Sequence, residues 1–182
     1  MAELLKDIDP ARAVSFSGHR PERLPGNGDP DAPEMQPLIA ALRQELIAAV
    51  ERDKTVMIHG CMAGWDIICG EKVIELKKQF PHVRLVSVAP YKTEFFVREK
   101  CWTPDWISRA REVFRQHDMG VKVAECYRKG IYYARNDLLI EHSSELICYH
   151  DGGRGGTKYT VDRAYGKGLT VRNLYNTAYP KI

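Results

Sequence analysis

Residues 145–160 read ELICYHDGGRGGTKYT, and this stretch decides the fold. The apolar run from Glu145 to His150 predicts a buried strand, followed by Asp151 and four glycines before Thr157 opens a helix. Glycines expose backbone N–H groups, and a helix N-terminus adds roughly half a positive charge at the same point. The stretch therefore predicts an anion-binding loop with phosphate as the expected ligand, although for an isolated run a glycine-rich surface turn is the commoner explanation.

Short apolar runs alternate with longer helical patterns over the rest of the chain. The predicted strands are residues 13–17, 55–60, 83–89, 121–125, 145–150 and 169–174. Apolar residues recur at helical spacing between the first two strands, at Leu38, Leu42, Leu46 and Val50, and again between the next two, at Trp65, Ile68, Cys69, Val73, Leu76 and Phe80. Strands separated by helices predict an α/β fold with a mainly parallel sheet of about six strands.

Three further segments have a recognisable pattern. Pro104 should divide residues 93–114 into two helical pieces, and residues 132–143 are mostly amphipathic. Residues 21–37 carry five prolines, which predicts a long ordered loop.

The composition limits the size and class of the protein. At 182 residues with 44% hydrophobic content, the chain can bury one sizeable core, and we expect a single domain over residues 1–182. The net charge of +3 is too small to demand a nucleic acid or an anionic membrane as partner. Neither a signal peptide nor a membrane span is recognisable, so the expected location is the cytoplasm.

Cysteine and histidine usage argues against a structural metal. The chain has five cysteines without a CxxC pair, an odd set typical of reduced, buried thiols. The six histidines are scattered at no ligand-like spacing from a cysteine or from one another. We therefore expect no metal site.

The loops that follow the predicted strands carry the unusual residues. In open α/β sheets, ligands bind beyond the carboxyl ends of the strands, where such loops converge. The first loop is SGHRP at residues 17–21, the second is GCMAGWD at 60–66, the third is PYK at 90–92, and the fourth is the glycine run. A ligand site built from these four loops is the expected arrangement.

Individual residues of these loops suit phosphate and ribose recognition. Arg20 offers a charge-assisted fork for phosphate, and His19 can donate or accept a proton near neutral pH. Asp66 could accept ribose hydroxyls, although capping the second helix would also account for it. Gly60 and Gly64 suggest a close approach to the backbone. Further along, Arg135 precedes Asn136.

The position of Arg135 leaves two alternatives open. Its guanidinium could fold back over the glycine run toward a phosphate, or it could pair with Glu141 or Asp137 on the surface.

Taken together, SGHRP, GCMAGWD, the segment ARNDLLIEHSSELI at residues 134–147 and DGGRGGT at 151–157 resemble the SLOG superfamily, and more narrowly its YpsA/YoqJ-like bacterial branch. The similarity runs from Ser17 to about Leu174. It implies a Rossmann-like three-layer domain that binds a nucleotide or nucleotide-derived ligand, needs no other cofactor and often forms a homodimer. The ligand-binding residues it implies, with the loop residues added, are Gly18, His19, Arg20, Gly60, Gly64, Asp66, Pro90, Tyr91, Arg135, Asn136, Asp151, Gly152, Gly153, Gly155, Gly156 and Thr157.

The superfamily also contains LOG enzymes, which cleave the N-glycosidic bond of cytokinin nucleotides, and DprA proteins, which bind single-stranded DNA. The LOG pattern P-G-G-x-G-T-x-x-E ends in a catalytic glutamate, whereas the matching stretch here ends in Thr160 and is preceded by Asp151 instead of proline. Threonine supplies no carboxylate for glycosidic cleavage. The leading hypothesis is therefore a nucleotide-binding module or sensor.

Two alternatives stay open. One is a LOG-like hydrolase that uses Asp66, His19 or Arg135 as catalytic residues. The other, ranked last because the charge is nearly balanced, is a DprA-like nucleic-acid binder with residues 127–135 as a small basic and aromatic stripe.

Overall fold

The computed structural model describes residues 5–92 and 98–178, and its centre is a sheet of six strands in the order β4-β3-β2-β1-β5-β6. Each neighbouring pair is parallel. The strands are β1 (Ala13–Gly18), β2 (Val56–His59), β3 (Arg84–Ala89), β4 (Met119–Lys122), β5 (Glu145–Tyr149) and β6 (Thr170–Asn173). The strand order reverses between β1 and β5, which creates a crevice between the loops that follow these two strands.

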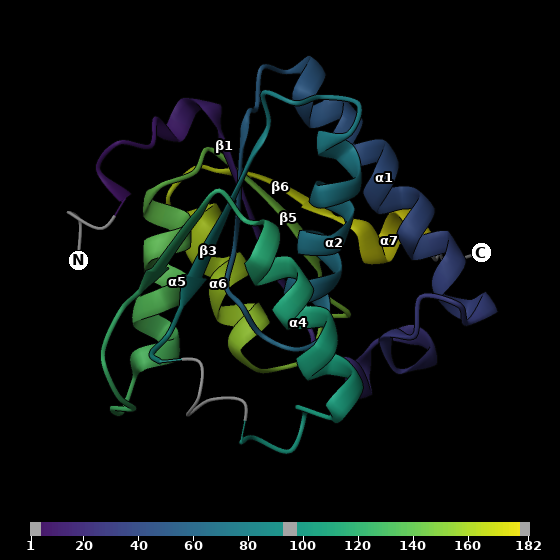
Figure 1. The fold of residues 1–182 in the computed structure, drawn as a ribbon. Coiled ribbons are helices and arrows are strands. Elements are labelled where there is room, and N and C mark those ends of the chain that lie inside the picture. Colours follow the sequence, from purple (N-terminus) through teal and green to yellow (C-terminus); the bar gives the residue numbers. More distant parts are fainter. Residues whose placement is uncertain (1–4, 93–97, 179–182) are drawn as a thin grey trace.

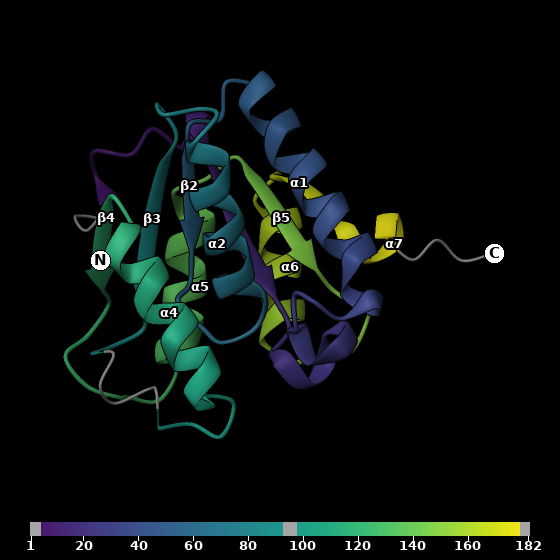
Figure 2. The same ribbon diagram turned by 45° about the vertical axis from the view of Figure 1, so that its right-hand side comes forward.

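Helices cover both faces of the sheet, as Figures 1 and 2 show. One face carries α1 (Gln36–Glu51), α2 (Trp65–Lys77), α4 (Pro104–Gln116) and the short α7 (Leu174–Ala178). The other face carries α5 (Ile131–Glu141) and α6 (Gly156–Gly166). The three layers confirm the predicted α/β Rossmann-like fold.

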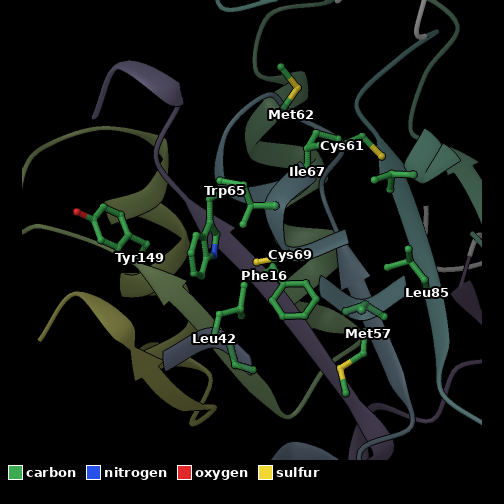
Figure 3. Packing of buried hydrophobic residues seen from close by; sticks show 14 of the residues in the cluster. Phe16, Leu42, Met57, Cys61, Met62, Trp65, Ile67, Cys69, Leu85 and Tyr149 are labelled. Atoms are coloured by element: carbon green, nitrogen blue, oxygen red, sulfur yellow. The ribbon is translucent and has the colours of Figure 1, made fainter. Parts of the chain in front are cut away.

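The main core lies between the sheet and the α1, α2 and α4 layer. In Figure 3, Phe16, Met57 and Leu85 of the strands pack with Leu42 of α1 and Trp65 of α2. A smaller cluster on the other face joins β5 to α6. Burying these apolar side chains stabilises the fold by roughly 1.5–3 kcal/mol per large residue.

The predicted helical stripes are core, with two exceptions at their ends. Leu38, Leu42 and Leu46 are buried, whereas Val50 is half-buried at the last turn of α1. The second stripe is buried through Leu76, and Phe80 lies half-buried beyond the end of α2.

Pro104 breaks the chain where the sequence predicts. It is the first residue of α4, and the Thr103 hydroxyl accepts a hydrogen bond from the backbone N–H of Trp106 at 3.4 Å. The sequence also predicts a helical piece before Pro104. Its residues 98–103 are turns and irregular backbone, and its residues 93–97 lie outside the described residues.

Two predicted segments differ from the structure. β4 begins two residues before the predicted 121–125. The sequence misplaces this edge strand because its residues alternate between half-buried and exposed, so it lacks the apolar run of a central strand. The predicted loop at 21–37 contains three 3₁₀ helices, each of which begins at a proline: η3 (Pro21–Arg23), η4 (Pro25–Gly28) and η5 (Pro33–Met35). The last two residues of the predicted loop belong to α1. A further 3₁₀ helix, η2 (Pro10–Arg12), precedes β1. Within residues 5–92 and 98–178, none of the helices has the length and apolar character that crossing a membrane requires.

Candidate functional site

A cavity of about 390 Å³ opens at the carboxyl ends of β1 and β2, between α5 and the start of α6. Nine of the predicted ligand residues line it, and they come from four separate parts of the chain. These residues are Gly18, His19, Arg20, Asp66, Arg135, Asn136, Gly155, Gly156 and Thr157. The structure thus brings together most of the site that the sequence suggests.

The other seven predicted residues do not border this cavity. They are Gly60, Gly64, Pro90, Tyr91, Asp151, Gly152 and Gly153. Tyr91 lines a different cavity, of about 610 Å³, together with Cys61, Ser87 and His117. The third strand-end loop is therefore separate from the cavity, because β3 lies two strands away from β1 in the sheet.

The glycine run, residues 151–156, is open at Gly152 and Gly156 and covered at Gly153, where a Cβ atom would collide with the Arg23 guanidinium. A Cβ atom built on Gly152 or Gly156 would meet nothing within 4 Å. Gly155 precedes α6 with a φ of 140°, a backbone conformation that residues other than glycine rarely adopt. Within the described part of the chain, no side chain caps this end of the helix. The first N–H groups of α6 are thus left for a ligand at the cavity wall.

His19 and Asp151 join the loops after β1 and β5. The Nε2 atom of His19 lies 2.9 Å from Asp151 Oδ1, and its Nδ1 atom lies 3.5 Å from the Thr157 hydroxyl. Burial lowers the pKa of His19, and the nearby Asp151 only partly opposes this effect. The two nitrogens of a neutral His19 thus face different groups: Nε2 faces the carboxylate and, at 3.4 Å, the backbone N–H of Asp151, and Nδ1 faces the Thr157 hydroxyl.

Arg23 is a charged cavity residue that the sequence prediction missed. Its guanidinium donates to both oxygens of Asp151, at 2.6 and 2.8 Å, and to the backbone oxygen of Arg154. Although burial opposes it, the hydrogen bonds from Gly153 and Arg23 hold the pKa of Asp151 well below its ordinary value. The sequence signal that could have pointed to Arg23 is Pro21. This proline begins a 3₁₀ turn directly after Arg20, and the turn brings Arg23 close to Arg20.

Arg20 lines the cavity but already has partners at its rim. Its guanidinium nitrogens lie 3.5 Å from the Glu99 carboxylate and 3.5 Å from Cys101 Sγ. These long contacts leave most of its hydrogen-bonding capacity available for an anion.

Arg135 adopts neither of the two positions that the sequence left open. It is buried and donates to the backbone oxygen of Gly60, to Asn136 Oδ1 at 2.8 Å and to Asp66 Oδ2 at 3.4 Å. Asp66 also accepts the Met62 N–H at 3.2 Å and does not cap α2. Burial raises the pKa of Asp66 and lowers that of Arg135, and each charge opposes the shift of the other.

The close approach to Gly60 and Gly64 is made by the protein itself. A Cβ atom on Gly64, whose φ is 97°, would lie 2.5 Å from the backbone oxygen of His19. A Cβ atom on Gly60 would collide with the guanidinium of Arg135. These glycines therefore let the loops after β1 and β2 and helix α5 pack together.

Thr160, at the position of the LOG glutamate, does not line the cavity. It is fully buried, and its hydroxyl donates to the backbone oxygen of Gly156 at 3.0 Å. It fixes the first turn of α6 and contributes no group to the cavity.

One group of side chains has the donor set of a metal site. Ligand atoms of His19, His150 and Asp151 lie within 4.8 Å of one another, because β1 and β5 are neighbours in the sheet. Both oxygens of Asp151 already accept hydrogen bonds from Arg23, so a cation here would have to displace a guanidinium. The cluster is described as well by an ion-pair network as by a metal site.

Comparison with solved structures places the fold among known ones. DNA processing protein A (DprA) from Helicobacter pylori matches with a TM-score of 0.58 and 22% identity over 94% of this chain and 68% of that chain. The protein TM1055 matches with a TM-score of 0.53 and 14% identity over 94% of this chain and 82% of that chain. DprA from Streptococcus pneumoniae matches with a TM-score of 0.56 and 16% identity over 94% of this chain, which spans about half (51%) of that protein. At these identities the likeness shows the fold alone.

Comparison of sequences shows the family. The uncharacterized prophage-derived protein YoqJ of Bacillus subtilis is 26% identical over 146 residues, 70% of this chain and 82% of YoqJ. A UPF0398 protein of Bacillus anthracis is 25% identical over 160 residues, 86% of this chain and 84% of that protein. The family model YpsA, described as the YspA SLOG family, matches residues 14–176. The chain therefore belongs to the YpsA SLOG family.

Proposed function

We propose that the cavity binds a nucleotide or a nucleotide-derived ligand, and that the protein acts as a binding module or sensor. The observation that carries the proposal is the end of the glycine run, Gly155 and Gly156, which lines the cavity and leads into the uncapped N-terminus of α6. Backbone N–H groups and a helix dipole aimed at one point favour a phosphate group.

The charges around the cavity support this assignment. Arg20 and Arg23 both line it, and the single carboxylate that Arg23 binds leaves part of its guanidinium available. Asp66 and Asn136 are polar and buried at the same cavity, where they could receive ribose hydroxyls. The volume of about 390 Å³ lies within the range of small-molecule sites.

A hydrolase remains the second candidate, and the His19–Asp151 pair is the observation that favours it. A neutral imidazole held by a carboxylate at the cavity wall is a suitable general base. Activity would appear as free base or ribose phosphate released from a bound nucleotide, and His19→Gln should abolish that release without abolishing binding.

A single-stranded DNA binder is the third candidate. The H. pylori DprA structure concerns single-stranded DNA binding, and in the present chain Tyr127, Arg128 and Lys129 are exposed before α5. Stacking aromatics beside basic groups suit a nucleic-acid strand. Binding of an oligonucleotide that weakens steeply with salt would favour this function over the first two.

Thermal unfolding against a panel of ligands tests the proposal. AMP, ADP-ribose, NAD, cyclic nucleotides and a short oligonucleotide are compared, and every sample is then analysed for released base. A ligand at about 100 times its Kd adds roughly 2.7 kcal/mol, or about 5–10 °C in Tm for a chain of this length. A shift without released base supports a binding module, a shift with released base supports a hydrolase, and no shift with any nucleotide overturns the proposal.

A further inference from the structure

Tyr133 is an aromatic side chain that the phosphate site does not use. It lies in the first turn of α5 and half of its surface (50%) is exposed. Within the described residues, the other exposed large hydrophobic side chains are Ile47, Tyr127 and Tyr165, and none of these lines the cavity, whereas Tyr133 does. An aromatic ring left half in water at a cavity wall is a surface on which a flat ligand can stack.

The ring of Tyr133 is supported from behind. Tyr159 packs against it edge to face, with ring centroids 4.6 Å apart and an interplanar angle of 68°. The Tyr159 hydroxyl donates to both oxygens of Asp137, at 2.9 and 3.0 Å, and Arg163 binds the same carboxylate at 3.0 Å. Because this chain of contacts fixes Tyr159, Tyr133 loses less rotamer freedom on binding a ligand than an unsupported side chain would.

The position of Tyr133 relates it to the glycine run. Its partner Tyr159 lies in the first turn of α6, three residues after Gly156, where that helix begins. Tyr133 therefore stands beside the helix end that would receive a phosphate. The adjacent Tyr132 is differently engaged, because its hydroxyl donates to Glu99 and lies 3.1 Å from the Tyr91 hydroxyl.

We infer that Tyr133 is the platform on which the base of a bound nucleotide stacks, with the phosphate of the same molecule at the start of α6. The inference rests on the proposed nucleotide function and adds the base subsite to it. It assigns the ligand class as a phosphate ester that carries a planar heteroaromatic base. Stacking on one face tolerates different bases, so the preference among bases must come from other contacts.

Calorimetric titration with two probes tests the inference. AMP carries both phosphate and base, whereas ribose 5-phosphate carries the phosphate alone. Tyr133→Ala should weaken AMP binding roughly 10- to 100-fold, the range of base–aromatic stacking, and leave ribose 5-phosphate within about 2-fold. Tyr133→Phe should restore AMP affinity, since it keeps the ring. Tyr165→Ala is the matched control, because Tyr165 is also an exposed tyrosine (62%) but lies outside the cavity.

The possible failures are distinguishable. If wild-type protein binds AMP no more tightly than ribose 5-phosphate, or if Tyr133→Ala changes AMP binding no more than Tyr165→Ala, the base platform is overturned while the phosphate site stands. If Tyr133→Ala weakens both probes equally, the residue supports the fold of the site and the platform is likewise overturned. If neither probe binds the wild-type protein, the proposed function fails and the platform fails with it.

Discussion

Gly64 shows at the residue scale how the loops around the cavity depend on one another. Its φ of 97° and the backbone oxygen of His19, 2.5 Å from where its Cβ would lie, leave no room for a side chain. Gly168 also has a positive φ, 77°, but nothing lies within 4 Å of its Cβ position. The two positions therefore separate the cost of backbone conformation from the cost of a collision.

We predict that Gly64→Ala destabilises the protein by roughly 2–4 kcal/mol, because it adds a backbone clash to the strain. Gly168→Ala should cost only about 1 kcal/mol, from conformation alone. Urea unfolding of both variants gives the comparison. Equal losses of unfolding free energy in the two variants would show that the loop after β1 moves aside at no cost, which would contradict its close packing against Gly64.

Asp66 and Arg135 should behave as one buried unit. Removing the carboxylate leaves the guanidinium as an uncompensated buried charge, and such changes typically cost about 3–5 kcal/mol. Asp66→Asn alone should therefore destabilise strongly, and Arg135→Met added to it should cost less than Arg135→Met alone.

A double-mutant cycle in urea checks this coupling, which we expect to be about 1–3 kcal/mol. Tyr165→Ala in place of Arg135→Met is the control pair and should be additive with Asp66→Asn. Additive losses for Asp66 and Arg135 would mean that the 3.4 Å contact contributes nothing beyond its surroundings.

At the scale of elements, the start of β5 is held by charges that lie at the opposite end of the sheet from the cavity. Glu145 accepts hydrogen bonds from Arg52 at 2.8 and 3.1 Å and from Arg172 at 3.3 Å, and Lys54 lies 3.7 Å away. Burial alone would raise the pKa of Glu145, but Arg52 and Arg172 outweigh it and lower the pKa below the ordinary 4.5, even though Glu45 shares both arginines.

The stabilisation from Glu145 should therefore depend on pH. A carboxylate with a lowered pKa stabilises the folded state fully above its ordinary pKa, and this contribution is lost as the pH falls through the lowered value. We predict that the difference in unfolding free energy between wild type and Glu145→Gln is largest above about pH 5 and shrinks toward pH 3. Glu51→Gln, an exposed change on α1, is the control. A difference that stays constant with pH would contradict the ion-pair network.

Elements were predictable from the sequence where one local signal dominates. β5 and α6 follow from the apolar run at 145–150 and from the glycines before Thr157, and Pro104 marks the start of α4 because proline lacks an N–H. β4 was misplaced because an edge strand is apolar on only part of its surface. The 3₁₀ helices at 21–35 were missed because single turns of this kind carry little sequence signal beyond their prolines.

The candidate site was predictable in three of its four expected loops, since residues 90–92 lie apart from the cavity, and it was not predictable in its contacts. The rule that ligands bind at strand ends located His19, Asp66 and the glycine run. It could not show that Arg135 turns to Gly60 and Asp66, nor that Arg23 binds Asp151, because both contacts depend on which distant segments the sheet order brings together.

At the scale of the whole molecule, the cavity ties together segments that are far apart in the chain. Its walls come from the loops after β1 and β2, from α5 and from the start of α6. A ligand that fills it should therefore stabilise all four segments together. The opposite end of the strands, around Arg52 and Glu145, has no contact with the cavity. Ligand binding should therefore protect it only against global unfolding and not against local opening.

We predict that saturating AMP slows amide hydrogen exchange in residues 18–23, 62–66, 131–139 and 154–158, and has little effect on fast exchange at residues 51–55 and 142–145. Mass spectrometry of peptides from the exchanged protein measures this. Protection confined to a single segment, or spread evenly over both edges of the sheet, would contradict a ligand seated in this cavity.

The most direct test of the central claim, that a phosphate binds at the start of α6, is AMP titration of Gly156→Ala and Gly156→Asp. Both variants add a Cβ at a position with no atom within 4 Å, so they differ chiefly in charge. We predict that Gly156→Ala binds AMP within about 3-fold of wild type, whereas Gly156→Asp loses at least about 30-fold because its carboxylate repels the phosphate and occupies the N–H groups. Its Tm without ligand should not fall, since an acidic residue stabilises a helix N-terminus. AMP binding by Gly156→Asp as tight as by Gly156→Ala would contradict the account.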